Sequence, residues 1–195
     1  MNYLAHFHLA WPDEDLLAGG LEGDYFKGPL NKQLPAGLER GVRLHRSIDA
    51  FTDQHPALAE LRAAFGPELR RYAGILVDLS FDHFLSLHWD TYADQPLQEF
   101  NSSVYKGLMA RRPDFSPAAR RMLDRIVQYD LLGVYGDWET VPASASRIGE
   151  RFTRGNPFLA IDDELTALRP QMEAAFIDFY PELQAFVGEQ RRQLN

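Results

Sequence analysis

Residues 70–89, RRYAGILVDLSFDHFLSLHW, decide how the rest of the chain folds. Drawn as a helix, this segment has apolar side chains on every side, and a helix that is apolar all round lies inside a protein. Asp78, Asp82 and His83 are the ionisable residues in its middle. We therefore predict a buried central helix over about 68–91, against which the other segments pack.

The flanking segments also have helical apolar spacing, and they lack the alternating runs rich in Val, Ile and Thr that are typical of strands. A chain of 195 residues that is 45% hydrophobic is long enough to bury one core. The predicted fold class is therefore all-α, a single-domain helical bundle over residues 1–195. Further helices are expected at about 2–10, from 13 towards 28, and at about 35–53, 57–65, 94–110, 116–133, 144–153 and 161–191, the last kinked or broken at Pro170 and Pro181.

Capping residues and prolines predict where several helices begin and end. Asp13 and Ser116 each precede a helical segment, and both residue types accept hydrogen bonds from the N–H groups of a first turn. Pro117 then takes the first helical position. The helix over about 35–53 is expected to stop before His55 and Pro56, because the residue that precedes a proline is disfavoured in the helical region.

Composition excludes several classes of function. The chain has no cysteine, so a metal would have to be held by histidine and carboxylate ligands. A reducing, cytoplasmic location fits this composition. No segment approaches the roughly 20 apolar residues that a membrane-spanning helix needs, so we expect no membrane insertion. The formal net charge of −8 argues against nucleic acid as a partner, because neutralising phosphates requires a basic surface.

Two stretches are locally basic within this acidic chain. Residues 27–46 contain five Lys or Arg residues against Glu39, and residues 106–125 contain six against Asp114 and Asp124. Such stretches are often the solvated faces of helices. The alternative is that they form a docking surface for an anionic partner.

The central helix carries a pair of carboxylates that a protein core does not favour. Asp78 and Asp82 are four residues apart, so both project from one face, with His83 beside them. No lysine or arginine lies within a helical turn of either carboxylate. Their compensation must therefore come from another helix, a metal ion or water.

A second polar group lies in GVRLHRSIDAFTD, residues 41–53, where His45, Asp49 and Asp53 are spaced by four and face one side of a helix. Helical bundles form metal sites by facing a histidine of one helix with acidic or histidine residues of another. A set rich in oxygen and free of sulfur suits Mn²⁺ or Mg²⁺, with Fe²⁺ and Zn²⁺ as further candidates. Asp53, near the helix end, also suits a role in organising the turn.

A purely structural interpretation of the same residues stays open. His45 and Asp49 would then be a local pair, Arg46 would neutralise Asp78 or Asp82, and no metal would bind.

Two features nearer the N-terminus are weaker candidates. His6 and His8 in NYLAHFHLA are two residues apart, so they point to opposite sides of a helix and at most one faces a shared site. Asp24 in GGLEGDYFKG lies near a helix end, where a capping or turn role competes with a functional one.

Taken together, these segments resemble one family. NYLAHFHLA at 2–10, GDYFKG at 23–28, LHRSIDAFTD at 44–53 and DLSFDHFLSLHW at 78–89 are similar, in order and spacing, to the acyl carrier protein phosphodiesterases. FIDFYPEL at 176–183 resembles the C-terminal segment of that family.

The resemblance implies hydrolysis of the phosphodiester that links 4′-phosphopantetheine to a serine of holo acyl carrier protein, with Mn²⁺ as cofactor. It also implies a fold that is a divergent relative of the HD-domain phosphohydrolases, which bind metal through a histidine and an adjacent His-Asp pair. Here the pair is reversed, Asp82-His83. The metal ligands predicted in this way are His45, Asp82 and His83. We add Asp24 to this set because its carboxylate is a suitable metal ligand.

The predicted catalytic residues are Asp49, Asp78, Arg46 and His6. Asp49 or Asp78 would orient or deprotonate a water, and Arg46 would neutralise phosphate charge through its planar fork of donors. Acyl carrier proteins are generally acidic, so the basic stretches 27–46 and 106–125 would dock this partner.

Three other interpretations remain open at this stage. One is a metal phosphohydrolase of the same fold that acts on a nucleotide or another small phosphate ester. Another is a helical module without catalytic activity that binds an acidic partner. A role at the membrane surface is disfavoured, because the basic residues lack an accompanying exposed Trp/Leu face.

Overall fold

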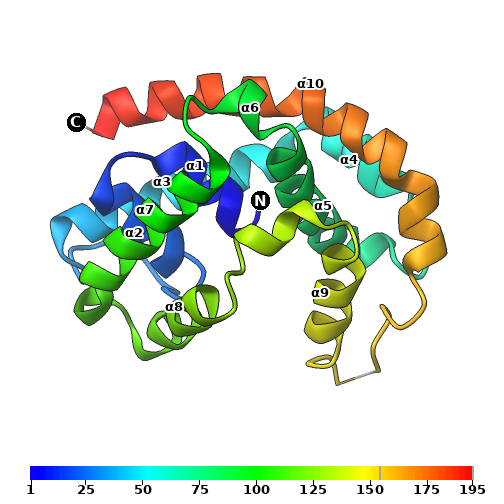
Figure 1. The fold of residues 1–195 in the computed structure, drawn as a ribbon, viewed down its shortest axis with the longest axis horizontal. Helices are drawn as coiled ribbons and strands as arrows, with labels where there is room; N and C mark the ends of the chain where they lie inside the picture. Colours follow the sequence, from blue (N-terminus) through cyan, green and yellow to red (C-terminus); the bar gives the residue numbers. More distant parts are fainter. Residues whose placement is uncertain (154, 195) are drawn as a thin grey trace.

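The computed structural model describes residues 1–153 and 155–194, and its elements of regular structure are helices joined by loops (Figure 1). In chain order its elements are α1 (Tyr3–Ala10), α2 (Glu14–Glu22), α3 (Ala36–Gln54), α4 (Pro56–Ala64), η1 (Arg70–Tyr72), α5 (Ala73–Leu87), α6 (Trp89–Tyr92), α7 (Leu97–Ala110), η2 (Arg112–Asp114), α8 (Pro117–Gln128), η3 (Gly133–Gly136), α9 (Thr140–Gly149) and α10 (Asp162–Leu194). No strand occurs among the described residues. The predicted all-α class is confirmed.

The helix boundaries follow the capping signals. The Asp13 side chain accepts hydrogen bonds from the backbone N–H groups of Asp15 and Leu16, at 3.0 and 3.1 Å. Ser116 caps α8 through a 3.3 Å bond from the N–H of Ala119. The chain leaves α3 at Gln54 and begins α4 at Pro56, as the proline predicts.

Several helix boundaries differ from the expectation. The second helix ends at Glu22, short of residue 28, and α9 begins at Thr140, four residues before the expected start. The helix expected over 116–133 ends at Gln128, because Asp130 adopts a left-handed conformation with φ of 46°. The N–H of Leu131 then bonds back to the carbonyl of Ile126 at 2.9 Å, which is the usual closure of a helix end.

The C-terminal helix α10 continues through Pro170 and Pro181 and arches over the molecule (Figure 1). Each proline removes one backbone hydrogen bond, so the sequence favours a kink or break at these positions. The packing of the segment between the two prolines opposes such a break. Phe176 and Phe179 are fully buried, and their ring centroids lie 5.4 and 5.9 Å from that of Phe81 in α5. Tertiary contacts therefore hold the segment as one helix.

The predicted central helix is α5, which packs against α1, α4, α9 and α10. It is shorter than expected, since residues 70–72 form the 3₁₀ turn η1 and the helix ends at Leu87. Leu76, Phe81 and Phe84 are fully buried within a single apolar cluster. Among the described residues, no helix combines the length and the apolarity that crossing a membrane requires.

Two glycines allow α2 and α3 to lie in direct backbone contact. A Cβ atom on Gly19 of α2 would overlap the backbone of Gly41 in α3, so only glycine permits this approach. The contact matters for the candidate site below, because α3 carries His45 and Asp49 while Asp24 follows α2.

We expect Gly19→Ala to lower the free energy of unfolding by about 1–3 kcal/mol, because the added methyl group forces the two backbones apart. Gly20→Ala is the matched control, since its Cβ would lie 3.5 Å from the ring of Phe7, an ordinary contact. Urea unfolding of both variants tests this, and equal stability of the two would contradict the role given to Gly19.

Candidate metal centre

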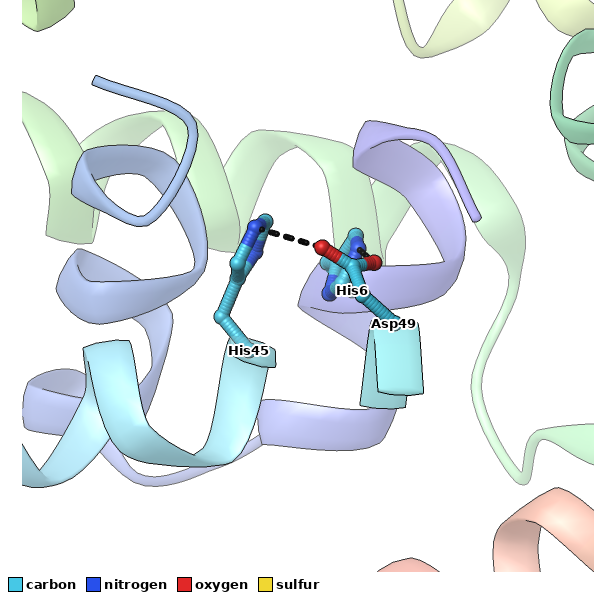
Figure 2. A group of neighbouring side chains, drawn as sticks. All are labelled: His6, His45 and Asp49. Carbon is cyan, nitrogen blue, oxygen red and sulfur yellow. Dashed lines mark ion pairs between the residues drawn. The ribbon is translucent and has the colours of Figure 1, made fainter. Parts of the chain in front are cut away.

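His6 of α1 and His45 and Asp49 of α3 form one compact group, shown in Figure 2, whose ligand atoms all lie within 4.8 Å of one another. The Asp49 carboxylate bridges the edges of the two imidazoles, with Oδ1 3.2 Å from Nε2 of His6 and Oδ2 3.1 Å from Nε2 of His45. The rings stack with centroids 4.1 Å apart. We call these three residues the His-His-Asp group.

Helical geometry explains how the sequence builds this group. His45 and Asp49 are one turn apart, so they share a face of α3. His6 and His8 point to opposite sides of α1, as expected. His6 joins the group, while His8 contacts the hydroxyl of Tyr180 at 2.7 Å and the carbonyl of Tyr92 at 3.0 Å.

The buried imidazoles lack hydrogen-bond partners. Both nitrogens of His6 and Nδ1 of His45 are buried and make no hydrogen bond with any described residue; the short contact from His6 to Asp49 lies outside hydrogen-bonding geometry. Burying such atoms without a partner costs free energy. Two imidazole nitrogens and a carboxylate oxygen are ligands that divalent metal ions accept, so the group fits a bound ion.

The charge states of the group also suit a cation. Burial and the neighbouring His45 lower the pKa of His6 to about 3, so its imidazole is neutral at pH 7. Burial works against ionisation of Asp49, but the contacts with His45 and His6 outweigh it and hold the pKa of Asp49 well below its ordinary value. A neutral imidazole and an ionised carboxylate are the forms that bind metals.

Asp24 lies at the edge of the group. Its Oδ1 is 3.6 Å from Nε2 of His45, and its pKa is raised, chiefly by burial. The preceding Gly23 contacts the His45 ring, and a Cβ there would overlap it, so glycine is required at this position. Sequence reasoning missed Gly23, although its place just before Asp24 was visible.

The group opens to solvent through a concavity of about 300 Å³ whose walls include Asp24, Lys27, His45, Arg46 and Asp49. The side chains of Asp24 and Asp49 are 45% and 42% exposed, so a ligand can reach them. We call this the site concavity.

Arg46 does not neutralise Asp78 or Asp82, which removes one part of the purely structural interpretation. Its guanidinium donates to the carbonyls of Gly28 and Phe26, at 2.9 and 2.8 Å. These bonds hold the loop after α2 against α3 and keep the cation in the wall of the site concavity.

The two carboxylates of the central helix find their partners at the start of the chain. Asp78 accepts a 2.8 Å hydrogen bond from the N-terminal ammonium group of Met1. Asp82 is fully buried and accepts from the backbone N–H groups of Leu4 and Ala5, at 2.7 and 3.2 Å. It thereby caps α1, whose Asn2 makes no side-chain capping bond. Burial raises the pKa of Asp82 to about 7, although the two N–H bonds oppose this shift.

His83 is also engaged away from the His-His-Asp group. Its Nδ1 lies 2.9 Å from the carbonyl of Tyr135, so Nδ1 carries the proton, and Nε2 accepts from Arg169 at 3.3 Å. Burial lowers the pKa of His83, which keeps the ring neutral. The structure therefore does not bring Asp82 and His83 together with His45, because the polar atoms of both already contact other groups.

Four of the eight arginines in the two basic stretches pair with nearby carboxylates. Arg40 contacts Asp13 at 2.9 Å, and Arg111 contacts Asp15 at 2.8 Å. Arg43 pairs with Glu39, and Arg112 with Asp124. These residues have little free charge to offer a partner.

Comparisons with known proteins agree with one another. A family model described as acyl carrier protein phosphodiesterase matches residues 1–183. The acyl carrier protein phosphodiesterase of Shigella boydii is 34% identical over 186 residues, which cover 95% of this chain and 96% of that protein. The protein of the same name from Escherichia coli K12 is 33% identical over 186 residues, with the same coverage. No solved structure shows a significant match.

Proposed function

Because this chain belongs to the acyl carrier protein phosphodiesterase family and is a phosphoric diester hydrolase, we propose that it cleaves holo acyl carrier protein with the aid of a divalent metal ion. The bond broken is the phosphodiester between the carrier's serine and 4′-phosphopantetheine, and the products are the apo carrier and 4′-phosphopantetheine. The observation that carries the metal dependence is the His-His-Asp group, in which both nitrogens of His6 and Nδ1 of His45 are buried without hydrogen-bond partners among the described residues. A cytoplasmic location belongs to the same proposal.

The proposed ligands are His6, His45 and Asp49, with Asp24 at the edge of the set. This set replaces the one drawn from the family resemblance, since Asp82 and His83 are occupied elsewhere. Mn²⁺ is the proposed ion, and Mg²⁺, Fe²⁺ and Zn²⁺ accept the same ligands. When bound, such an ion lowers the pKa of a water and polarises a phosphoryl oxygen.

The surrounding side chains have separate roles in this proposal. Arg46 and Lys27, in the wall of the site concavity, neutralise charge on the phosphate. Asp24 is ionisable, partly exposed and next to His45, so it is placed to accept a proton from water. Asp78 remains the alternative base, although its Oδ1 is paired with the Met1 ammonium group.

The test is to incubate the purified protein with holo acyl carrier protein and Mn²⁺ and to follow the intact mass of the carrier. We expect loss of the phosphopantetheine mass, and we expect a chelator to prevent it and added Mn²⁺ to restore it. If the mass of the carrier stays unchanged with each of the four ions in turn, the proposal is refuted.

Two other outcomes would favour the alternative functions. Rapid cleavage of nucleotides or other small esters, with the carrier left intact, would indicate a small-molecule phosphohydrolase. Metal-independent binding of the carrier without cleavage would indicate a binding module.

A further inference from the structure

A cavity of about 840 Å³, which we call the large cavity, lies beside the candidate metal centre. Residues of α8 and α9 form much of its wall, and Tyr3 and Tyr25 contribute near the N-terminus. Asp24 lines both this cavity and the site concavity, so the two spaces meet at that residue. A ligand in the large cavity would therefore reach the His-His-Asp group at one end.

The wall of the large cavity combines apolar and basic side chains, with Asp24 and Glu139 as its acidic members. Leu79, Met122 and Ile148 supply apolar surface. Arg125, Arg147 and Arg151 line it with exposed side chains, and we call these three the arginine rim. In contrast to Arg40 and Arg111, none of the three forms an ion pair with a carboxylate in residues 1–153 or 155–194.

Large apolar side chains are also exposed at this cavity. Tyr129 and Val134 are 57% and 40% exposed, and both belong to its wall. Exposed apolar surface surrounded by charged residues is typical of a site that a ligand or partner covers. An apolar floor with unpaired arginines predicts an elongated, partly apolar ligand carried by an acidic partner.

We propose that the large cavity receives the 4′-phosphopantetheine arm of the carrier, while the arginine rim contacts the carrier's acidic surface. The inference rests on the proposed function and specifies the path by which that substrate enters. The arm is an extended chain of amides with a branched apolar segment, which matches a wall of mixed character. Of the basic residues expected to dock the carrier, only Arg125 belongs to this rim.

The first test fills the cavity. Ala143 is exposed on α9 and lines the wall, so Ala143→Trp places a large ring in the cavity without disturbing the core. We expect kcat/KM for the holo carrier to fall on the order of a hundredfold, because the arm can no longer align its phosphate. Hydrolysis of bis(p-nitrophenyl) phosphate, which needs only the site concavity, should change less than about twofold.

The second test reverses charge on the rim. Arg125→Glu combined with Arg147→Glu is expected to raise KM for the carrier by at least about tenfold, leave kcat nearly unchanged and flatten the salt dependence. Arg121→Glu is the matched control, because Arg121 is exposed on the same helix but does not line the cavity. An equal rise in KM for the carrier in the control and in the double variant would refute the role given to the arginine rim.

The outcomes separate this inference from the proposed function. If the wild type cleaves the carrier and Ala143→Trp does so equally well, the cavity assignment is wrong while the function stands. If the wild type cleaves no carrier, calorimetric titration with free 4′-phosphopantetheine and Mn²⁺ tests the cavity assignment by itself. Binding that is lost in Ala143→Trp supports the cavity, and the absence of binding to the wild type overturns it.

Discussion

Asp49→Asn is expected to abolish metal binding and to reduce metal-dependent hydrolysis by at least about a hundredfold. Substitutions of residues that only hydrogen-bond to metal ligands already reach a loss of about this size. Asp49 supplies the carboxylate that lies within 3.2 Å of one imidazole and 3.1 Å of the other. Asparagine keeps the volume but removes the negative charge that a divalent ion requires. The variant should therefore fold normally and fail to bind the ion.

The measurement is calorimetric titration of each variant with Mn²⁺, together with the shift in melting temperature that the ion causes. A ligand that binds only the folded state raises the melting temperature, so this shift should vanish in Asp49→Asn. Asp53→Asn is the matched control: Asp53 lies one turn further along α3, is exposed and pairs with Arg62 at 3.0 Å. Wild-type affinity in Asp49→Asn would remove Asp49 from the ligand set.

Asp82→Leu is expected to lower the free energy of unfolding by about 3 kcal/mol or more, since each buried group left unsatisfied costs about 1–3 kcal/mol. The substitution removes the acceptor for the N–H groups of Leu4 and Ala5, and no side chain of α1 replaces it. Asp82→Asn retains one acceptor oxygen and should lose less stability. Urea unfolding measures both variants.

The same variants separate a structural role of Asp82 from ligation. If Asp82 supports α1, the molecules of Asp82→Asn that remain folded should bind Mn²⁺ with nearly wild-type affinity. A variant of unchanged stability that has lost Mn²⁺ binding would show instead that Asp82 is a ligand.

The fold was largely predictable, because it depends on local signals. The apolar side chains on every side of residues 70–89 identified α5. Asp13, Ser116 and Pro56 identified three helix boundaries. The continuous course of α10 through Pro170 was not predictable, because the contacts that hold it come from aromatic residues of another helix.

The arrangement of the candidate site was predictable only where its members share a helix. The spacing of His45 and Asp49 placed both on one face of α3, and the structure joins them at 3.1 Å. His6 was predicted as a catalytic residue, but its position against Asp49 and His45 was not visible, since α1 meets α3 only after folding. The family resemblance implied Asp82 as a ligand together with His45, yet the carboxylate of Asp82 is satisfied by the backbone of α1.

The sequence by itself determined the helices, the absence of cysteine ligands and the residues able to hold a metal, because periodicity and side-chain chemistry are properties of short segments. Only the tertiary structure decided which polar residues share a site and which support the fold. The reason is that a buried charge is satisfied by whatever group packs against it. Asp82 accepts its hydrogen bond from the N–H of Leu4, which is 78 residues away in the chain.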